Sequence, residues 1–142
     1  MKYLSKSEKD TAHLAQTFVK GLETGQSVAL IGELGAGKTA FVKGVAQALG
    51  IKQTVNSPTF VLMRVYSVKK HPVIKHLVHV DAYRIQKAAS LTAIGLNDYI
   101  KDPASLVLIE WADRVMSILP SKATVIRFKH LTPENRQIDI NN

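Results

Sequence analysis

The sequence contains no cysteine, which excludes disulfide bonds, thiolate metal sites and cysteine nucleophiles. It also lacks long apolar runs. The longest stretch without Asp, Glu, Lys or Arg is the 11 residues from Gln53 to Met63, whereas a membrane-spanning helix needs about 18 or more. The first ten residues, MKYLSKSEKD, are charged and have no apolar core of the kind found in signal peptides. These absences predict a protein of the reducing cytoplasm that makes no use of a membrane.

The length of 142 residues is that of one ordinary domain. The hydrophobic share of 46% and the charged share of 21% are close to globular averages. No internal repeat or low-complexity tract interrupts the chain. We therefore predict one domain over residues 1–142.

The net charge of +8 is unevenly distributed. Residues 1–70 hold ten Lys and Arg against four Asp and Glu, and residues 71–142 hold nine against seven. A basic surface attracts polyanions such as nucleotides or RNA. Lysines scattered over solvated faces explain the same sum equally well, because the sequence has no dense basic run with interleaved aromatic residues.

Helical and apolar patterns alternate along the chain. Ser7 is an expected N-cap, with Asp10 three residues later and apolar residues at helical spacing up to Gly25. The other expected helices lie at residues 39–49, at 88–101 with a break at Gly95, and as a short helix before Pro120. The expected strands lie at 27–31, 59–66, 73–81, 106–109, 124–130 and 137–140, with 59–66 and 73–81 forming a hairpin. This order predicts an α/β fold with a mixed central sheet.

The segment Gly32–Thr39, GELGAGKT, matches G-x-x-x-x-G-K-[ST] in full and lies between an expected strand and an expected helix. Its glycines allow successive N–H groups to surround a phosphate, and the helix directs its positive dipole end at the same place. Lys38 is expected to contact the β- and γ-phosphates and the Thr39 hydroxyl to bind Mg²⁺. The strand and helix context disfavours the alternative of a simple glycine turn. The expected nucleotide-binding residues of this P-loop are Glu33, Leu34, Gly35, Ala36, Gly37, Lys38, Thr39 and Ala40.

Two apolar strands end in a carboxylate, Asp81 and Glu110. Glu110 is the better candidate for Mg²⁺, because an unbroken apolar run places it at the end of a central strand beside the P-loop. Asp81 is expected to polarise the attacking water or to hold a metal-bound water. For either residue, the alternative is a strand-end carboxylate that caps the next helix.

Three further features belong to the predicted site or are excluded from it. Ser57 and Thr59 lie in a loop where many P-loop proteins sense the γ-phosphate, although turn chemistry by itself explains Asn-Ser-Pro-Thr. Trp111 follows Glu110 and either shapes the site or packs in the core. His76 and His79 are three apart on a strand and face opposite sides, so we expect no metal site there.

Three functions are compatible with these residues. The first is hydrolysis of a nucleotide. The sequence has no N-K-x-D stretch, the guanine-reading motif of most GTPases, so we expect the base of this nucleotide to be adenine. A small-molecule kinase with the same P-loop is an alternative, although the chain has little spare length for a lid or an acceptor-binding insertion. A third possibility is a nucleotide-gated binding module without useful turnover.

Many unrelated NTPases share the P-loop, so this motif by itself does not identify a family. The chain also has four ordered motifs that are much more specific than the P-loop alone: S-P-T at 57–59, D-x-Y-R at 81–84, G-x-x-D-Y at 95–99 and E-W at 110–111. With them, nearly the whole chain resembles TsaE, also called YjeE, the bacterial ATPase of tRNA threonylcarbamoyladenosine biosynthesis. The resemblance implies a P-loop NTPase-like, three-layer fold.

The resemblance also implies roles for individual residues. Thr39 and Glu110 would bind Mg²⁺, Asp81 would be needed for hydrolysis together with Lys38, and Trp111 would matter for activity. The segment 57–59 would form a switch-like loop. Thr11 and Arg136 would flank the adenine.

The resemblance further implies partners. The protein would use ATP and Mg²⁺ and act with TsaB and TsaD, which transfer the threonylcarbamoyl group to an adenosine beside the tRNA anticodon. Its ATP hydrolysis would support their turnover. Apart from the resemblance, the excess of basic residues in the first half of the chain offers a possible contact for the tRNA.

Overall fold

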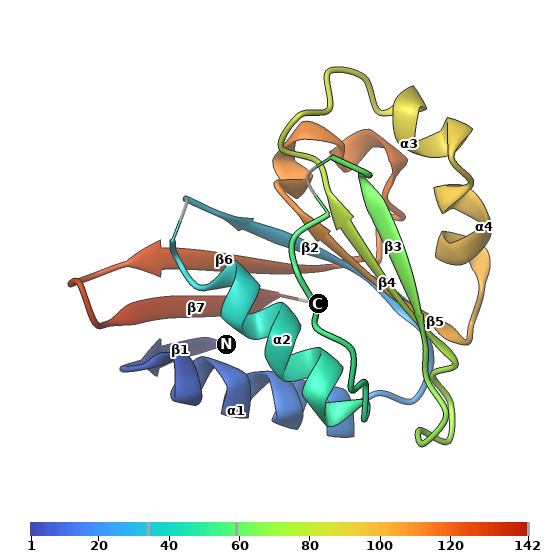
Figure 1. Ribbon diagram of the computed structural model, residues 1–142. Helices are drawn as coiled ribbons and strands as arrows, with labels where there is room; N and C mark the ends of the chain where they lie inside the picture. Colours follow the sequence, from blue (N-terminus) through green and yellow to red (C-terminus); the bar gives the residue numbers. More distant parts are fainter. Residues whose placement is uncertain (34, 59, 142) are drawn as a thin grey trace.

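A mixed β-sheet forms the centre of the computed structural model, which describes residues 1–33, 35–58 and 60–141 (Figure 1). Within these residues the sheet has seven strands in the order β1-β7-β6-β2-β5-β4-β3. The strands are β1 (Lys2–Ser5), β2 (Gln26–Gly32), β3 (Met63–Ser67), β4 (His76–Asp81), β5 (Ser105–Glu110), β6 (Thr124–His130) and β7 (Arg136–Asn141). The central strands β6, β2, β5 and β4 are parallel, whereas β3, β7 and β1 run antiparallel to their neighbours.

Helices cover both faces of the sheet and make three layers (Figure 1). One face is covered by α1 (Glu8–Lys20) and α2 (Lys38–Ala48). The other face is covered by α3 (Ala89–Ala93), α4 (Leu96–Lys101) and the 3₁₀ turns η1 (Ala112–Arg114) and η2 (Met116–Ile118). The predicted α/β class and P-loop NTPase-like layering are confirmed.

The helix predicted after Ser7 begins as expected but ends earlier. The Ser7 Oγ accepts a hydrogen bond from the Asp10 N–H at 3.0 Å, and Asp10 Oδ2 accepts one from the Lys6 N–H at 3.0 Å. The first of these bonds satisfies an N–H group that the first turn leaves free, and the second ties the turn to the residue before the N-cap. The helix ends at Lys20, with Gly21 as its C-cap, so Leu22 and Gly25 follow it rather than belong to it.

Two predicted strands are shorter than expected. The run predicted as a strand over 59–66 pairs only from Met63, because the chain turns first: the Leu62 N–H bonds the Pro58 carbonyl at 2.7 Å, and Leu62 has a φ of 69°. The next strand starts at His76 rather than Val73. The predicted hairpin is confirmed, since β3 and β4 pair antiparallel.

The structure contains one strand that the sequence patterns do not predict, and one predicted helix is wrong. The unpredicted strand is the edge strand β1, whose four residues are stabilised by pairing with β7, far away in sequence. The short helix expected before Pro120 is a pair of 3₁₀ turns. The break at Gly95 is confirmed, since Gly95 has a φ of 92° and separates α3 from α4.

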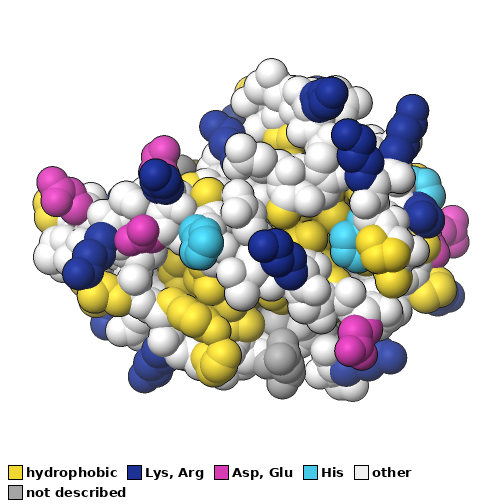
Figure 2. Space-filling view, turned by 90° about the horizontal axis from the view of Figure 1, so that it is seen from below, with side chains coloured by type: hydrophobic (Ala, Val, Ile, Leu, Met, Phe, Trp, Pro, Cys, Tyr) yellow, Lys and Arg dark blue, Asp and Glu magenta, His cyan; other side chains and the backbone are white. Residues whose placement is uncertain are grey.

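The surface distribution of charge bears on the possible partners. On the face seen in Figure 2, Lys and Arg side chains are scattered among Asp, Glu and His rather than gathered in one patch.

None of the helices in the described part of the chain is long and apolar enough to cross a bilayer.

A close contact between α1 and α2 generates a stability prediction. A Cβ added at Gly44 would lie 2.8 Å from Ala12 Cα and 2.9 Å from Ala15 Cβ, so Gly44→Ala must push the helices apart. We expect a loss of about 1–3 kcal/mol in the free energy of unfolding, despite the higher helix propensity of alanine. The measurement is urea denaturation, with Gln47→Ala on the exposed face of α2 as control. A variant as stable as the native protein would contradict this packing argument.

Candidate functional site

The loop after β2 has the backbone conformation that its glycines allow. Gly35 and Gly37 have φ values of 76° and 110°, which side chains with a Cβ rarely adopt, and Gly37 caps the start of α2. Gly32 lies against β6, where a Cβ would come within 2.7 Å of the Phe128 carbonyl oxygen. The loop therefore runs from a buried parallel strand into a helix N-terminus, the arrangement that binds phosphates.

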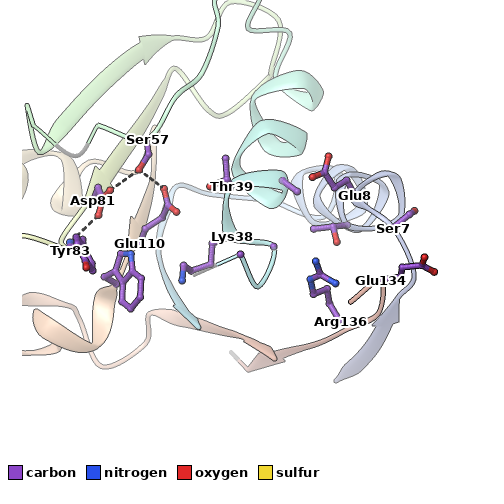
Figure 3. A pocket seen from close by; sticks show the side chains of 15 residues that line it. Ser7, Glu8, Lys38, Thr39, Ser57, Asp81, Tyr83, Glu110, Glu134 and Arg136 are labelled. Atoms are coloured by element: carbon purple, nitrogen blue, oxygen red, sulfur yellow. Dashed lines mark hydrogen bonds between the residues drawn. The ribbon is translucent and has the colours of Figure 1, made fainter. Parts of the chain in front are cut away.

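A cavity of about 490 Å³ lies beside this loop (Figure 3). It brings together most of the site residues expected from the sequence. Its described lining residues are Ser7, Glu8, Thr11, Gly35, Gly37, Lys38, Thr39, Ala40, Ser57, Asp81, Tyr83, Glu110, Trp111, Glu134 and Arg136.

Some expected residues are not part of this lining. Glu33 has an exposed side chain, and the Ala36 side chain is buried in the core at 1% exposure. The Ala36 N–H bonds the Glu33 carbonyl at 3.1 Å, so both shape the loop. The expected roles of Leu34 and Thr59 fall on residues outside those described.

Lys38 turns back onto its own loop. Its Nζ donates to the carbonyl of Gly32 and, at 3.0 Å, to that of Glu33, and it lies 4.0 Å from the centroid of the Trp111 ring. Burial lowers the pKa of Lys38, while the nearby carboxylates, chiefly that of Glu110, oppose the shift. The Lys38 Nζ is therefore surrounded by carbonyl oxygens and an aromatic face in place of bulk water.

Asp81 and Glu110 lie opposite each other at the ends of β4 and β5. Both are buried, at 3% and 4% exposure. The Ser57 Oγ lies 2.6 Å from Asp81 Oδ2 and 3.5 Å from Glu110 Oε2, so it bridges the pair (Figure 3). Asp81 Oδ1 also accepts a hydrogen bond from the Tyr83 N–H at 2.9 Å. Asp81 thus caps a turn rather than the next helix, which was the alternative role expected for it, and both carboxylates line the cavity.

Trp111 adopts a strained backbone conformation beside the carboxylates. Its φ of 56° is in the left-handed region, where a bulky residue costs of order 1–3 kcal/mol. In this conformation the Trp111 ring lies between Lys38 and Tyr83. The centroids of the Trp111 and Tyr83 rings are 5.0 Å apart. Trp111 is half-buried, which fits a wall of the cavity better than a position in the core.

The opposite end of the cavity is built by α1 and β7. The buried Thr11 hydroxyl lies 2.7 Å from Ser5 Oγ, and Arg136 Nη1 donates to the Pro133 carbonyl at 3.0 Å. A Cβ at Gly37 would lie 4.0 Å from both Thr11 Oγ1 and Arg136 Cγ. The residues expected to flank an adenine therefore lie next to the glycine-rich loop after β2.

A sequence model of the family described as threonylcarbamoyl adenosine biosynthesis protein TsaE matches residues 5–138. The chain belongs to the TsaE family. The family takes part in tRNA threonylcarbamoyladenosine biosynthesis.

Individual TsaE relatives are similar over nearly the whole chain. The TsaE protein of Treponema pallidum is 37% identical over 140 residues, covering 99% of each chain. That of Bacillus subtilis is 33% identical over 138 residues, covering 97% of this chain and 83% of the relative. A crystal structure of Bacillus subtilis YdiB superposes with a TM-score of 0.78 at 29% identity, covering 97% of this chain and 82% of that one.

His79 is a site residue that sequence reasoning missed. Its Nε2 lies 2.6 Å from Glu110 Oε2, whereas His76 faces away and lies 3.7 Å from Asp102. The useful signal was the period of two, which puts His79 on the same face as Asp81, beside the end of the neighbouring strand.

The contact of Lys38 with the single tryptophan generates a spectroscopic prediction. Lys38→Ala removes a cation 4.0 Å from the Trp111 ring, so we expect a change in the intensity or wavelength of the tryptophan emission. Lys43→Ala, on the exposed side of α2, is the matched control and should leave the spectrum unchanged. Superimposable spectra of Lys38→Ala and native protein would contradict the contact.

Proposed function

We propose that the protein binds ATP with Mg²⁺ and hydrolyses it as the accessory ATPase of tRNA threonylcarbamoyladenosine biosynthesis, acting with TsaB and TsaD in the cytoplasm. The observation that carries the proposal is the convergence of a phosphate-binding loop, a buried lysine and two strand-end carboxylates on one cavity of about 490 Å³. Membership of the TsaE family supports the pathway.

Phosphate binding follows from the loop and from Lys38. The backbone N–H groups of the loop and the N-terminus of α2 supply partial positive charge for a polyphosphate. Lys38 now donates to the carbonyls of Gly32 and Glu33, and phosphate oxygens are stronger acceptors than these carbonyls. Lys38 therefore exchanges carbonyl partners for the β- and γ-phosphates when the nucleotide binds.

The side chains around the loop fit a magnesium ion. Thr39, Ser57, Asp81 and Glu110 present oxygen atoms to the cavity, and oxygen is the ligand that Mg²⁺ prefers. Among the described residues, no three or more His, Cys, Asp or Glu side chains form a group that could hold a metal ion by themselves. This matches Mg²⁺ at nucleotide sites, which takes one or two carboxylates and completes its shell with phosphate and water. Thr39 and Glu110 would hold the ion, which neutralises charge developing on the phosphates.

Asp81 is the residue that acts on the attacking water. Its two oxygens accept from the Ser57 hydroxyl and from the Tyr83 N–H, and these bonds fix the orientation of the carboxylate. A carboxylate held in this way can accept a hydrogen bond from water and align it for attack. Ser57 connects Asp81 with the loop 57–59, which we propose as the switch-like segment.

The base lies at the other end of the cavity. The Arg136 guanidinium offers a planar cation for an aromatic base, and Thr11 adds a hydroxyl. Their position beside Gly37 suits an adenosine whose phosphates extend along the loop.

Among the described lining residues the one arginine is Arg136, which lies away from the two carboxylates (Figure 3). Arg84 and Arg114 are not among the described lining residues. The guanidinium carbon of Arg84 lies 4.7 Å from the centroid of the Phe60 ring, and that of Arg114 lies 5.6 Å from the centroid of the Tyr83 ring. Fast phosphoryl transfer often uses an arginine supplied from the same chain or from a partner. This supports an ATPase that TsaB and TsaD complete from outside.

The two carboxylates should have separable effects. Glu110→Gln should weaken Mg²⁺-dependent nucleotide binding as well as turnover, because an amide oxygen is a poorer ligand for a hard cation. Asp81→Asn should slow turnover more than it weakens binding. Titrations of nucleotide and Mg²⁺ on both variants, together with phosphate release, provide the measurement. The reverse pattern would mean that the two roles are exchanged.

The function itself is tested by phosphate release with and without purified TsaB and TsaD. We expect the protein alone to hydrolyse ATP more slowly than the roughly 1–100 s⁻¹ typical of kinases, and the partners to raise the rate. Lys38→Ala should abolish hydrolysis in both conditions. Adding tRNA at two salt concentrations tests a direct contact, which should weaken as salt rises.

Three outcomes would contradict the proposal. Fast hydrolysis that the partners do not change would indicate a self-sufficient enzyme. Transfer of phosphate to an acceptor instead of water would indicate a kinase. Nucleotide binding with no turnover in any of these mixtures would indicate a binding module.

A further inference from the structure

His79 makes a short buried contact with the proposed metal ligand. It lies on β4 at 1% exposure, and its Nε2 is 2.6 Å from Glu110 Oε2. In the parallel pairing of β4 with β5, His79 is opposite Leu108 and Asp81 is opposite Glu110. Residues two apart on a strand share a face, so His79 and Glu110 meet on the face that α2 covers.

This contact is the short hydrogen bond that fixes Glu110. The other described hydrogen bond to its carboxylate comes from Ser57 Oγ and is long, at 3.5 Å, because the same hydroxyl makes its short bond, of 2.6 Å, to Asp81. A glutamate side chain has several rotatable bonds, and loses its preferred orientation when nothing holds its carboxylate. His79 therefore selects the position of the Glu110 carboxylate.

The bond makes the two carboxylate oxygens of Glu110 different from each other. The Nε2–H donates to Oε2, and no described residue donates a hydrogen bond to Oε1. An oxygen left in this state on the wall of a cavity is available to an ion. Ligating carboxylates are commonly held by hydrogen bonds of this kind from a second residue.

Stability alone is a poor explanation for histidine at this position. Its Nδ1 is buried and has no hydrogen-bond partner among the described residues. An unpaired buried polar atom costs stability, whereas the neighbouring positions on this face, Leu77 and Leu108, are filled by apolar side chains at no such cost. The role of His79 therefore lies in its bond to Glu110.

We propose that His79 is a positioning residue that holds the Glu110 carboxylate through Oε2 and leaves Oε1 to bind Mg²⁺. This inference rests on the proposed function, because it needs Glu110 to be a metal ligand. It predicts an effect on metal dependence that is absent from the binding of nucleotide without metal.

The test uses nucleotide binding by titration calorimetry, at increasing Mg²⁺ and separately in EDTA. His79→Leu removes the donor and should raise the Mg²⁺ concentration for half-maximal binding about tenfold, the lower end of the range for partners of metal ligands. Binding in EDTA should not change. His79→Gln retains an N–H donor and should recover part of the effect. His76→Leu, on the same strand but facing away, is the control.

A second arm asks whether His79 acts through Glu110. In a Glu110→Gln background, His79→Leu should add no further change in Mg²⁺ dependence. Additive effects, equal losses with and without metal, or an unchanged Mg²⁺ requirement in His79→Leu and His79→Gln would overturn the inference. If Glu110→Gln alone leaves the Mg²⁺ requirement unchanged, the assignment of Glu110 fails and this inference fails with it. If Glu110→Gln shifts the requirement and the His79 variants do not, the proposed function stands without the role of His79.

Discussion

Parallel pairing of β2 with β5, and of β5 with β4, is the constraint on which the site depends. It sets Leu30 opposite Glu110 and Glu110 opposite Asp81, so the end of β2 and both carboxylates reach the same edge of the sheet. The register is held by strands whose side chains are buried on both faces. A slip of one residue would move each side chain to the other face and bury apolar side chains in the cavity. The packing of the core and the geometry of the site are therefore one requirement.

Sequence reasoning was most successful where a local pattern determines the structure. The P-loop was recognisable because its spacing, the apolar strand before it and the helical pattern after it must occur together. Asp81 and Glu110 were identifiable because each ends an apolar run, and in a parallel sheet the ends of such runs meet at one edge. Thr11 and Arg136 came only from the family resemblance, because nothing in their local sequence connects residues so distant along the chain.

The errors arose where distant contacts decide the structure. The segment before Met63 has the residue types of a strand, yet Leu62 turns back on Pro58 and leaves Phe60 exposed at 83%. The edge strand β1 depends on β7, and its sequence has little strand character of its own. His79 looked like part of an inert histidine cluster until the sheet brought it to Glu110. Local patterns say which face a residue takes, and only the pairing says what it meets there.

The two walls of the cavity are made at different times during synthesis. Thr11 lies on α1 and Arg136 begins β7, which pairs with β1. The loop after β2 and the helix α2 leave the ribosome long before β7 does, so the cavity stays open on one side until that strand docks. A nucleotide that binds in this cavity, as we propose, would therefore bind chains with a finished sheet in preference to incomplete ones. Since a ligand stabilises the state that binds it, ATP would stabilise the pairing of β7 with β1 in the newly made chain.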